Sequence, residues 1–233
     1  NRTALHQSAV RRVAMLPNGV GYIDLKAFSD STEKELSRSV TALLARGAKS
    51  LILDLRSNPG GLLEQGTRVA DLFLDKGERI VSLRGRTPQA NQDFNDSTPQ
   101  RWPNLPLAVL VDEKSASAAE IVAGALQDHD RAVIIGEPTY GKGSAQSIIP
   151  LGEDGALKIT TARWYTPSGR SISRRLDRDD NDFAAGPAPD PHRYKTASGR
   201  VVYDGGGIAP DVVASDSAYS AEVRLLQSVL GRN

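Results

Sequence analysis

Three short stretches of the sequence carry groups whose types and spacing could do chemistry. Ser117 lies among small residues in Ser115–Glu120, Lys142 lies between two glycines, and Gly60 and Gly61 follow a proline. A serine can attack a carbonyl carbon once a base removes its proton, and small neighbours leave room for an acyl group. A lysine can be that base when its ammonium is desolvated, and backbone N–H groups near glycines can bind a developing oxyanion.

Each stretch also has a purely structural explanation, and the local pattern does not separate the two. The spacing Ser117-x-x-Glu120 is a capping box, in which the serine caps the helix that follows. Gly60 and Gly61 form a turn signal between a strand and a helix, where they supply positive φ angles. Lys142 reads equally well as a solvated lysine in a turn.

A competing function is nucleotide binding by the loop Gly136–Ser144. This loop nearly matches the phosphate-binding pattern G-x-x-x-x-G-K-[ST], but Gly143 replaces the hydroxyl residue that binds magnesium. The pattern also requires a helix after the loop, whereas Ser144–Pro150 predicts a strand. Magnesium-dependent nucleotide binding would identify this alternative.

Histidine offers no base for Ser117. His6 and His192 lie in polar stretches, and His129 ends the predicted helix that Ser117 begins. That helix would separate Ser117 from His129 by roughly 16–18 Å, too far for a catalytic triad. We expect His129 to interact with the C-terminal end of the helix instead.

The elements that must position these groups alternate between strands and helices, which predicts an α/β fold with right-handed parallel crossovers. Predicted strands are residues 12–16, 20–25, 50–55, 107–111 and 132–135, with a hairpin turn at Pro17–Gly19. Predicted helices begin near Asp30, Leu62 and Ser117 and end near Gly47, Leu74 and Asp128. Residues 84–106 and 170–200 are polar and aperiodic, typical of long loops or hairpin extensions, and residues 218–230 have helical spacing.

The composition is that of an ordinary globular domain, with 39% hydrophobic and 24% charged residues among 233. Because the sequence contains no cysteine, it has no disulfide framework, thiol nucleophile or zinc–thiolate site. A net charge of +1 gives no field that favours nucleic acid or an anionic membrane. The apolar runs are shorter than the ~18 residues of a spanning helix, and the chain opens without a charged and apolar leader.

Taken together, the segments resemble the C-terminal processing, or tail-specific, peptidases. The matching strings are GYIDLKAF, LILDLRSNPGGLL, SASAAEIVAGALQDHDRAVIIG, PTYGKGSAQSIIPL, TARWYTPSGRSI and VYDGGGIAPDV. They run in the order that the family uses and cover residues from about 20 to 213. The family more often has S-A-S-A-S-E where this chain has Ala119, but the serine at the position of the nucleophile is present.

The resemblance implies a Ser/Lys catalytic pair, with Ser117 as nucleophile and Lys142 as general base. Gln146 stands where many members have a glutamine that supports the lysine. Asp128 falls on a further supporting position implicated in some members, although its pattern is that of a helix-end carboxylate.

The resemblance further implies an oxyanion hole formed by backbone N–H groups of Gly60 or Gly61 and of Ala118. It implies a ClpP/crotonase-like core of stacked ββα units with added β-hairpins. We expect residues 1–233 to be a single protease core domain that lacks the PDZ domain with which such enzymes recruit substrates.

The function implied is a serine endopeptidase that cleaves protein substrates with unstructured C-terminal tails through an acyl-enzyme, without metal or other cofactor. Its location by resemblance is extracytoplasmic: periplasm, cell envelope, secreted or thylakoid lumen. The alternative of another class is a catalytically silent peptide-binding module of the same fold, in which Ser117 is only a cap. A fluorophosphonate probe, which reacts with activated serines, separates the two.

Overall fold

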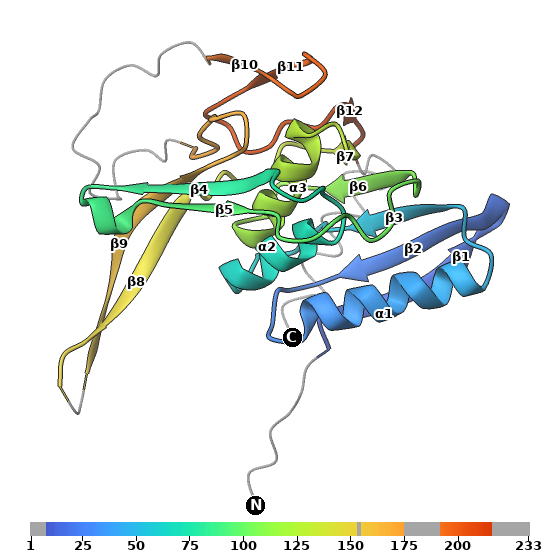
Figure 1. Ribbon diagram of the computed structural model, residues 1–233, viewed down its shortest axis with the longest axis horizontal. Helices are drawn as coiled ribbons and strands as arrows, with labels where there is room; N and C mark the ends of the chain where they lie inside the picture. Colours follow the sequence, from blue (N-terminus) through green and yellow to red (C-terminus); the bar gives the residue numbers. More distant parts are fainter. Residues whose placement is uncertain (1–7, 153–154, 175–191, 216–233) are drawn as a thin grey trace, which may run out of the picture.

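The computed structural model describes residues 8–152, 155–174 and 192–215, whose strands form three sheets (Figure 1). The α-helices are α1 (Thr32–Ala45), α2 (Leu63–Asp71) and α3 (Ala118–Asp128), and short 3-10 turns occupy Pro17–Gly19 and Pro88–Ala90. The strands are β1 (Val10–Leu16), β2 (Val20–Leu25), β3 (Ser50–Asp54), β4 (Arg79–Gly85), β5 (Gln92–Asn95), β6 (Leu107–Val111), β7 (Val133–Gly136), β8 (Ser144–Pro150), β9 (Ala156–Tyr165), β10 (Arg193–Lys195), β11 (Val201–Tyr203) and β12 (Val212–Val213).

The main sheet has the strand order β1-β2-β3-β6-β7-β12. β1 and β2 form the predicted antiparallel hairpin, and the pairs from β2 to β12 are parallel. The central strands are apolar runs, as is typical of parallel strands that helices cover. Helix α1 contacts β1 and β2, and α3 contacts β7. The expected α/β class and the parallel crossover from β6 through α3 to β7 are confirmed.

Helix α3 lies inside the molecule, since every residue from Ala118 to Asp128 is buried. It packs against α2, against β7 of the main sheet and against β4 of the second sheet. Small residues make this possible: a Cβ atom on Gly124 would lie 2.9 Å from Ile208 Cδ1 and 3.0 Å from Thr166 Cγ2. Neighbouring segments therefore pack closely against the middle of α3.

The second sheet is antiparallel, with the order β5-β4-β9-β8. The segment 84–106, expected as loops or a hairpin extension, contains part of the β4–β5 hairpin. The strand β4 was not among those predicted. Residues Ser144–Pro150 form a strand, β8, as the sequence predicts. The hairpin of β8 with β9 projects from the body of the molecule (Figure 1).

The C-terminal part of the described chain adds the small hairpin β10–β11 and the short strand β12. Most of the predicted surface segment 170–200, namely 175–191, and the predicted helix 218–230 lie outside the described residues. In the part of the chain that the structure describes, no helix has the length and hydropathy of a membrane span.

Candidate active site

Ser117 lies at the junction between β6 and α3, where it is the N-cap residue of the helix. Its φ is 55° and its ψ is −114°, a conformation that a residue with a Cβ rarely adopts. The preceding turn is held by Ser115, whose Oγ donates to Leu55 O at 2.8 Å and accepts from Asp112 N at 2.9 Å. Such strain at an N-cap, beside the positive end of a helix dipole, is typical of functional positions.

Of the glycine pair after β3, Gly60 lies directly against Ser117, and Gly61 packs against Phe28. A Cβ atom on Gly60 would be 2.6 Å from Ala116 O, 2.8 Å from Ser117 Cβ and 2.9 Å from Ala118 N. Gly60 and Gly61 have φ angles of 91° and 147°, so both the contact and the conformation require glycine. The structure thus brings together the predicted glycines, Ser117 and Ala118.

Asn58 fixes this glycine turn. Its side chain is buried, donates from Nδ2 to Leu25 O at 2.7 Å, and accepts at Oδ1 from Gly60 N at 2.9 Å. Its own carbonyl accepts from Ala116 N at 2.9 Å. Because the Gly60 N–H already binds Asn58, Gly61 is the better candidate of the two glycines for an oxyanion donor.

Glu120 joins the turn at Ser117 to the loop between β7 and β8, residues 137–143, which we name the lysine loop. Its fully buried carboxylate accepts at Oε2 from Ser117 N at 2.8 Å and from Lys142 N at 3.0 Å. Oε1 accepts from Thr139 Oγ1 at 2.5 Å and from Gly141 N at 2.7 Å. The backbone nitrogens of Ser117 and Lys142 are no more than about 6 Å apart, because each lies within hydrogen-bond distance of one oxygen.

Burial raises the pKa of the Glu120 carboxyl above its usual range, and the four hydrogen bonds oppose that rise. The sequence analysis anticipated only the capping-box half of this arrangement, the contact with Ser117. The contacts with Thr139, Gly141 and Lys142 were missed. The available signal was an acidic residue in a helix that is otherwise apolar, which requires partners from elsewhere.

Lys142 lies on the loop between β7 and β8, and its side chain is exposed in the described structure. The described residues therefore do not desolvate its ammonium, and a substrate bound over the site would have to do so. Ser144 begins a strand rather than a helix. The helix N-terminus on which a phosphate-binding loop depends is thus not formed by this segment.

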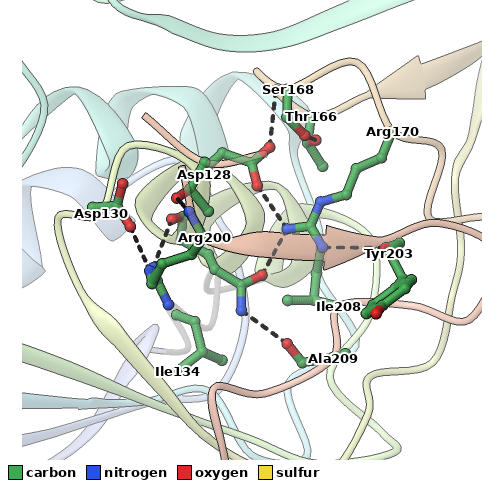
Figure 2. Close-up of polar contacts among 12 residues, drawn as sticks. Asp128, Asp130, Ile134, Thr166, Ser168, Arg170, Arg200, Tyr203, Ile208 and Ala209 are labelled. Carbon is green, nitrogen blue, oxygen red and sulfur yellow. Dashed lines mark hydrogen bonds and ion pairs between the residues drawn. The ribbon is translucent and has the colours of Figure 1, made fainter. Parts of the chain in front are cut away.

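Three other predicted residues lie apart from this junction. Gln146 is exposed on β8, beside a register shift in its pairing with β9. Asp128 ends α3 and forms a buried ion pair with Arg170, with Asp128 Oδ1 2.8 Å from Arg170 Nη2 (Figure 2). His129 is the C-cap of the same helix, as expected, and its Nε2 lies 2.7 Å from Arg79 O.

Metal ligands do not gather in the described ranges: no three histidine or acidic residues there are placed to hold an ion. The chemistry that the junction itself can support is acyl transfer. It offers the hydroxyl of Ser117, a lysine whose backbone is held beside that of Ser117, and backbone amides at a helix N-terminus.

Residues 19–181 match peptidase family S41. The chain is 50% identical over 157 residues to the carboxy-terminal-processing protease of Bartonella bacilliformis, covering 66% of this chain and 36% of that protein. It is 38% identical over 161 residues to the carboxy-terminal processing protease CtpA of Bacillus subtilis, covering 69% and 34%. It is also 40% identical over 166 residues to the chloroplastic carboxyl-terminal-processing peptidase 1 of Arabidopsis thaliana, covering 70% and 34%.

Among solved structures, the photosystem II D1 C-terminal processing protease matches with a TM-score of 0.64 and 28% identity, over 97% of this chain and 51% of that one. An S41 protease structure from Bacteroides fragilis matches with a TM-score of 0.65 at 20% identity, over 99% and 60%, and shares the fold. The chain spans about a third of the length of the curated relatives that it matches. The match to the family model over most of the sequence confirms the expected resemblance, since the curated relatives are named as carboxy-terminal processing proteases, and it shows that this chain belongs to peptidase family S41.

Proposed function

We propose that this chain is the catalytic core of a serine endopeptidase that cleaves protein substrates near their C-termini. The observation that carries the proposal is the shared acceptor oxygen of Glu120. It holds the backbone of Ser117 and the backbone of Lys142 side by side although they come from different loops. A purely structural capping box needs only the first of these two contacts.

The reaction proceeds through an acyl-enzyme. Lys142, as a neutral amine, takes the proton from Ser117 Oγ while the oxygen attacks the scissile carbonyl carbon. The Lys142 ammonium formed in this way then gives that proton to the leaving amine as the peptide bond breaks. Water, deprotonated by Lys142 in turn, attacks the acyl carbon and releases the new carboxylate together with the regenerated serine hydroxyl.

The developing oxyanion is stabilised by backbone amides. Ala118 N lies at the first turn of α3, and the Gly60–Gly61 turn packs against it. Fixed dipoles of this kind stabilise the tetrahedral intermediate without reorganising, which is where much of the rate enhancement of such enzymes originates. We assign the two donors to Gly61 and Ala118, with Gly60 as the residue that brings them together.

The two remaining predicted residues have different parts in this proposal. Gln146 lies on β8, shortly after Lys142 in sequence. In this proposal its side chain contacts that of the lysine once a substrate covers the loop. Asp128 takes part in the ion pair with Arg170 and acts on the site through other residues.

The substrates we propose are proteins with unstructured C-terminal tails, processed outside the cytoplasm. This rests on the matched proteins, which are named for carboxy-terminal processing and include one from the chloroplast. Recruitment of such tails by a PDZ domain in a longer chain would raise their local concentration, an effect worth ~10²–10⁴ in apparent affinity.

The test is cleavage of a disordered protein with a free apolar C-terminus, beside the same protein with that end masked. Cleavage of the substrate by the wild-type chain and none by Ser117→Ala supports the proposal. We expect residues 1–233 by themselves to cleave both substrates slowly and with similar KM. Turnover by purified Ser117→Ala would exclude Ser117 as the nucleophile. Strong preference of the wild-type chain for the substrate with the free C-terminus would mean that residues 1–233 themselves recognise that C-terminus.

A further inference from the structure

Two segments that follow Lys142 in sequence, residues 170–174 and 203–208, lie against the lysine loop. We name these two segments the brace. The first segment binds the loop through Arg174 N, which donates to Gly141 O at 2.9 Å. The second binds it through Ile208 N, which donates to Thr139 Oγ1 at 2.7 Å, and through Thr139 N, which donates to Ile208 O at 3.1 Å. Since Thr139 and Gly141 are also donors to Glu120, the brace is one step from the shared acceptor of Ser117 and Lys142.

The two segments of the brace are joined to each other. Gly205 N donates to Ser171 O and Gly207 N donates to Ile172 O, each at 2.9 Å. Ile172 is fully buried between them and the core. A displacement of either segment therefore moves the other.

No space separates the brace from the lysine loop. A Cβ atom on Gly141 would lie 2.7 Å from Arg174 Cβ, and one on Gly207 would lie 2.7 Å from Thr139 Oγ1. Both glycines have positive φ, 86° and 84°. Packing this close transmits small shifts instead of absorbing them.

Arg170 anchors the brace to the far end of α3. Its side chain is fully buried, and Nη2 donates to Asp128 Oδ1 at 2.8 Å and to Gln127 Oε1 at 2.6 Å. Nη1 donates to Tyr203 O at 3.3 Å, at the start of the second segment (Figure 2). One guanidinium thus ties together the end of the helix and both segments of the brace.

This geometry is specific to arginine. The planar fork contacts three acceptors on two elements, which a lysine ammonium on a flexible stem cannot reproduce. A buried ion pair of this kind adds little net stability but fixes one arrangement, because any displacement leaves a charge unpaired. The second segment also lies outside residues 19–181, the part matched to the family.

We propose that Arg170 is a positioning residue for Lys142, acting through the brace, Thr139 and Glu120; this rests on the proposed function. Arg170 does not touch the reacting atoms, since it pairs with the end of α3 opposite to Ser117. Its contribution is to hold the lysine loop where the amine meets the serine hydroxyl. Misplacement of a catalytic group by 1 Å can cost about 10²-fold in rate.

The first test compares Arg170→Lys with a control, Arg131→Lys. Arg131 also bridges two segments, since its guanidinium donates to Phe73 O at 3.1 Å and to Trp102 O at 2.8 Å in part-buried hydrogen bonds. Neither segment is hydrogen-bonded to the lysine loop in the described structure. We expect Arg170→Lys to lower kcat by roughly 10²-fold with KM within about twofold, and Arg131→Lys to change neither. Equal kcat values for the two variants would overturn the proposal.

The second test does not depend on a buried charge and uses three consecutive glycines. Gly207→Ala adds a methyl group against Thr139, whereas Gly205→Ala adds one at a similar φ of 83° with nothing within 4 Å. Gly206→Ala adds one in open space without positive φ. Loss of kcat in Gly207→Ala beyond that in Gly205→Ala, with Gly206→Ala unchanged, supports the brace; equal losses in Gly205→Ala and Gly207→Ala contradict it.

The third readout needs no activity, so it separates failure of this inference from failure of the proposed function. Hydrogen exchange of the peptide that contains Gly141 and Lys142 reports the two amides bound to Glu120. Arg170→Lys should accelerate that exchange by at least about tenfold, and Arg131→Lys should leave it unchanged. Unchanged exchange in a folded Arg170→Lys protein would overturn the proposal even if the wild-type chain is an active peptidase.

Discussion

The backbone N–H groups of Ser117 and Lys142 donate to the same oxygen, Oε2 of Glu120. This relationship converts two distant stretches of sequence into one site. It also couples the backbone positions of the proposed nucleophile and the proposed base, because a movement of the Glu120 carboxylate changes both.

Ser117→Ala and Ser117→Gly should both abolish turnover, but they should differ in stability. The φ of 55° at this position is strained for any residue with a Cβ, and glycine relieves that strain. We expect Ser117→Gly to be more stable than Ser117→Ala by on the order of 1 kcal/mol in urea unfolding. A less stable glycine variant would show that the strain at Ser117 is not stored in the folded protein.

Lys142→Arg should be inactive at every pH at which the protein is folded. Arginine keeps the positive charge but cannot give up its proton in this range, so it cannot take the proton of the serine. The control is His129→Ala, which should keep most of the activity because His129 lies at the opposite end of α3. Steady-state turnover of a peptide substrate measures both, and an inactive, folded His129→Ala would contradict the assignment of the base.

Glu120 should make activity and stability depend on pH in opposite directions. Its pKa is raised by burial, so its ionised form, which holds Ser117 and Lys142, forms only above the usual carboxyl range, and activity should increase there. The unfolded chain loses this proton at lower pH than the folded protein does. The free energy of unfolding should therefore fall as pH rises between the ordinary and the raised pKa.

Comparison of the wild-type protein with Glu120→Gln tests this prediction. The amide keeps one acceptor oxygen but does not titrate, so the rise of activity in the acid range and the matching fall in stability should both disappear. A stability profile identical to that of the wild-type protein would show that Glu120 does not titrate with a raised pKa.

Asp96 should destabilise the protein above neutral pH. It is 4% exposed, Oδ1 accepts from Thr98 N at 2.8 Å, and Oδ2 is buried without a partner among the described residues. Burial, with further contributions from Asp71 and Glu78, raises its pKa to about 7. Because the folded carboxyl holds its proton to higher pH than the unfolded one, the stability it provides is present in acid and is lost as pH rises through 7.

Asp96→Asn measures that loss. The neutral amide should increase the free energy of unfolding more at pH 8 than at pH 5, by at least about 1 kcal/mol. The same increase at both pH values would mean that the gain is one of packing, with no titration of Asp96 involved.

Much of the fold could be predicted because its signals are local. The strand Leu107–Val111 is an uninterrupted apolar run and was predicted with its observed bounds. Helix α3 has a cap at one end and a small, apolar body. The strand β4 was missed although it forms a hairpin with β5, and its second partner, β9, lies about eighty residues later, where no local period reveals it.

The residues proposed to react could be singled out from the sequence, whereas the residues that hold them in place could not. Ser117, Lys142 and the glycine pair were found from residue types and from resemblance, and the structure brings their backbones together. The reach of Glu120 to Thr139 and Gly141 depends on how α3 packs against the lysine loop. The brace depends on contacts between residues 170–174 and 203–208, which have no signature in the sequence.

The most direct test of the Ser/Lys assignment is the rate at which a fluorophosphonate probe modifies Ser117, located by peptide mass spectrometry, in the wild-type protein and in Lys142→Ala. The account predicts a single adduct on Ser117 in the wild-type protein and modification slower by at least about 10²-fold in Lys142→Ala, since general-base assistance contributes roughly this much. An adduct on another residue, or equal rates in the two proteins, would contradict it.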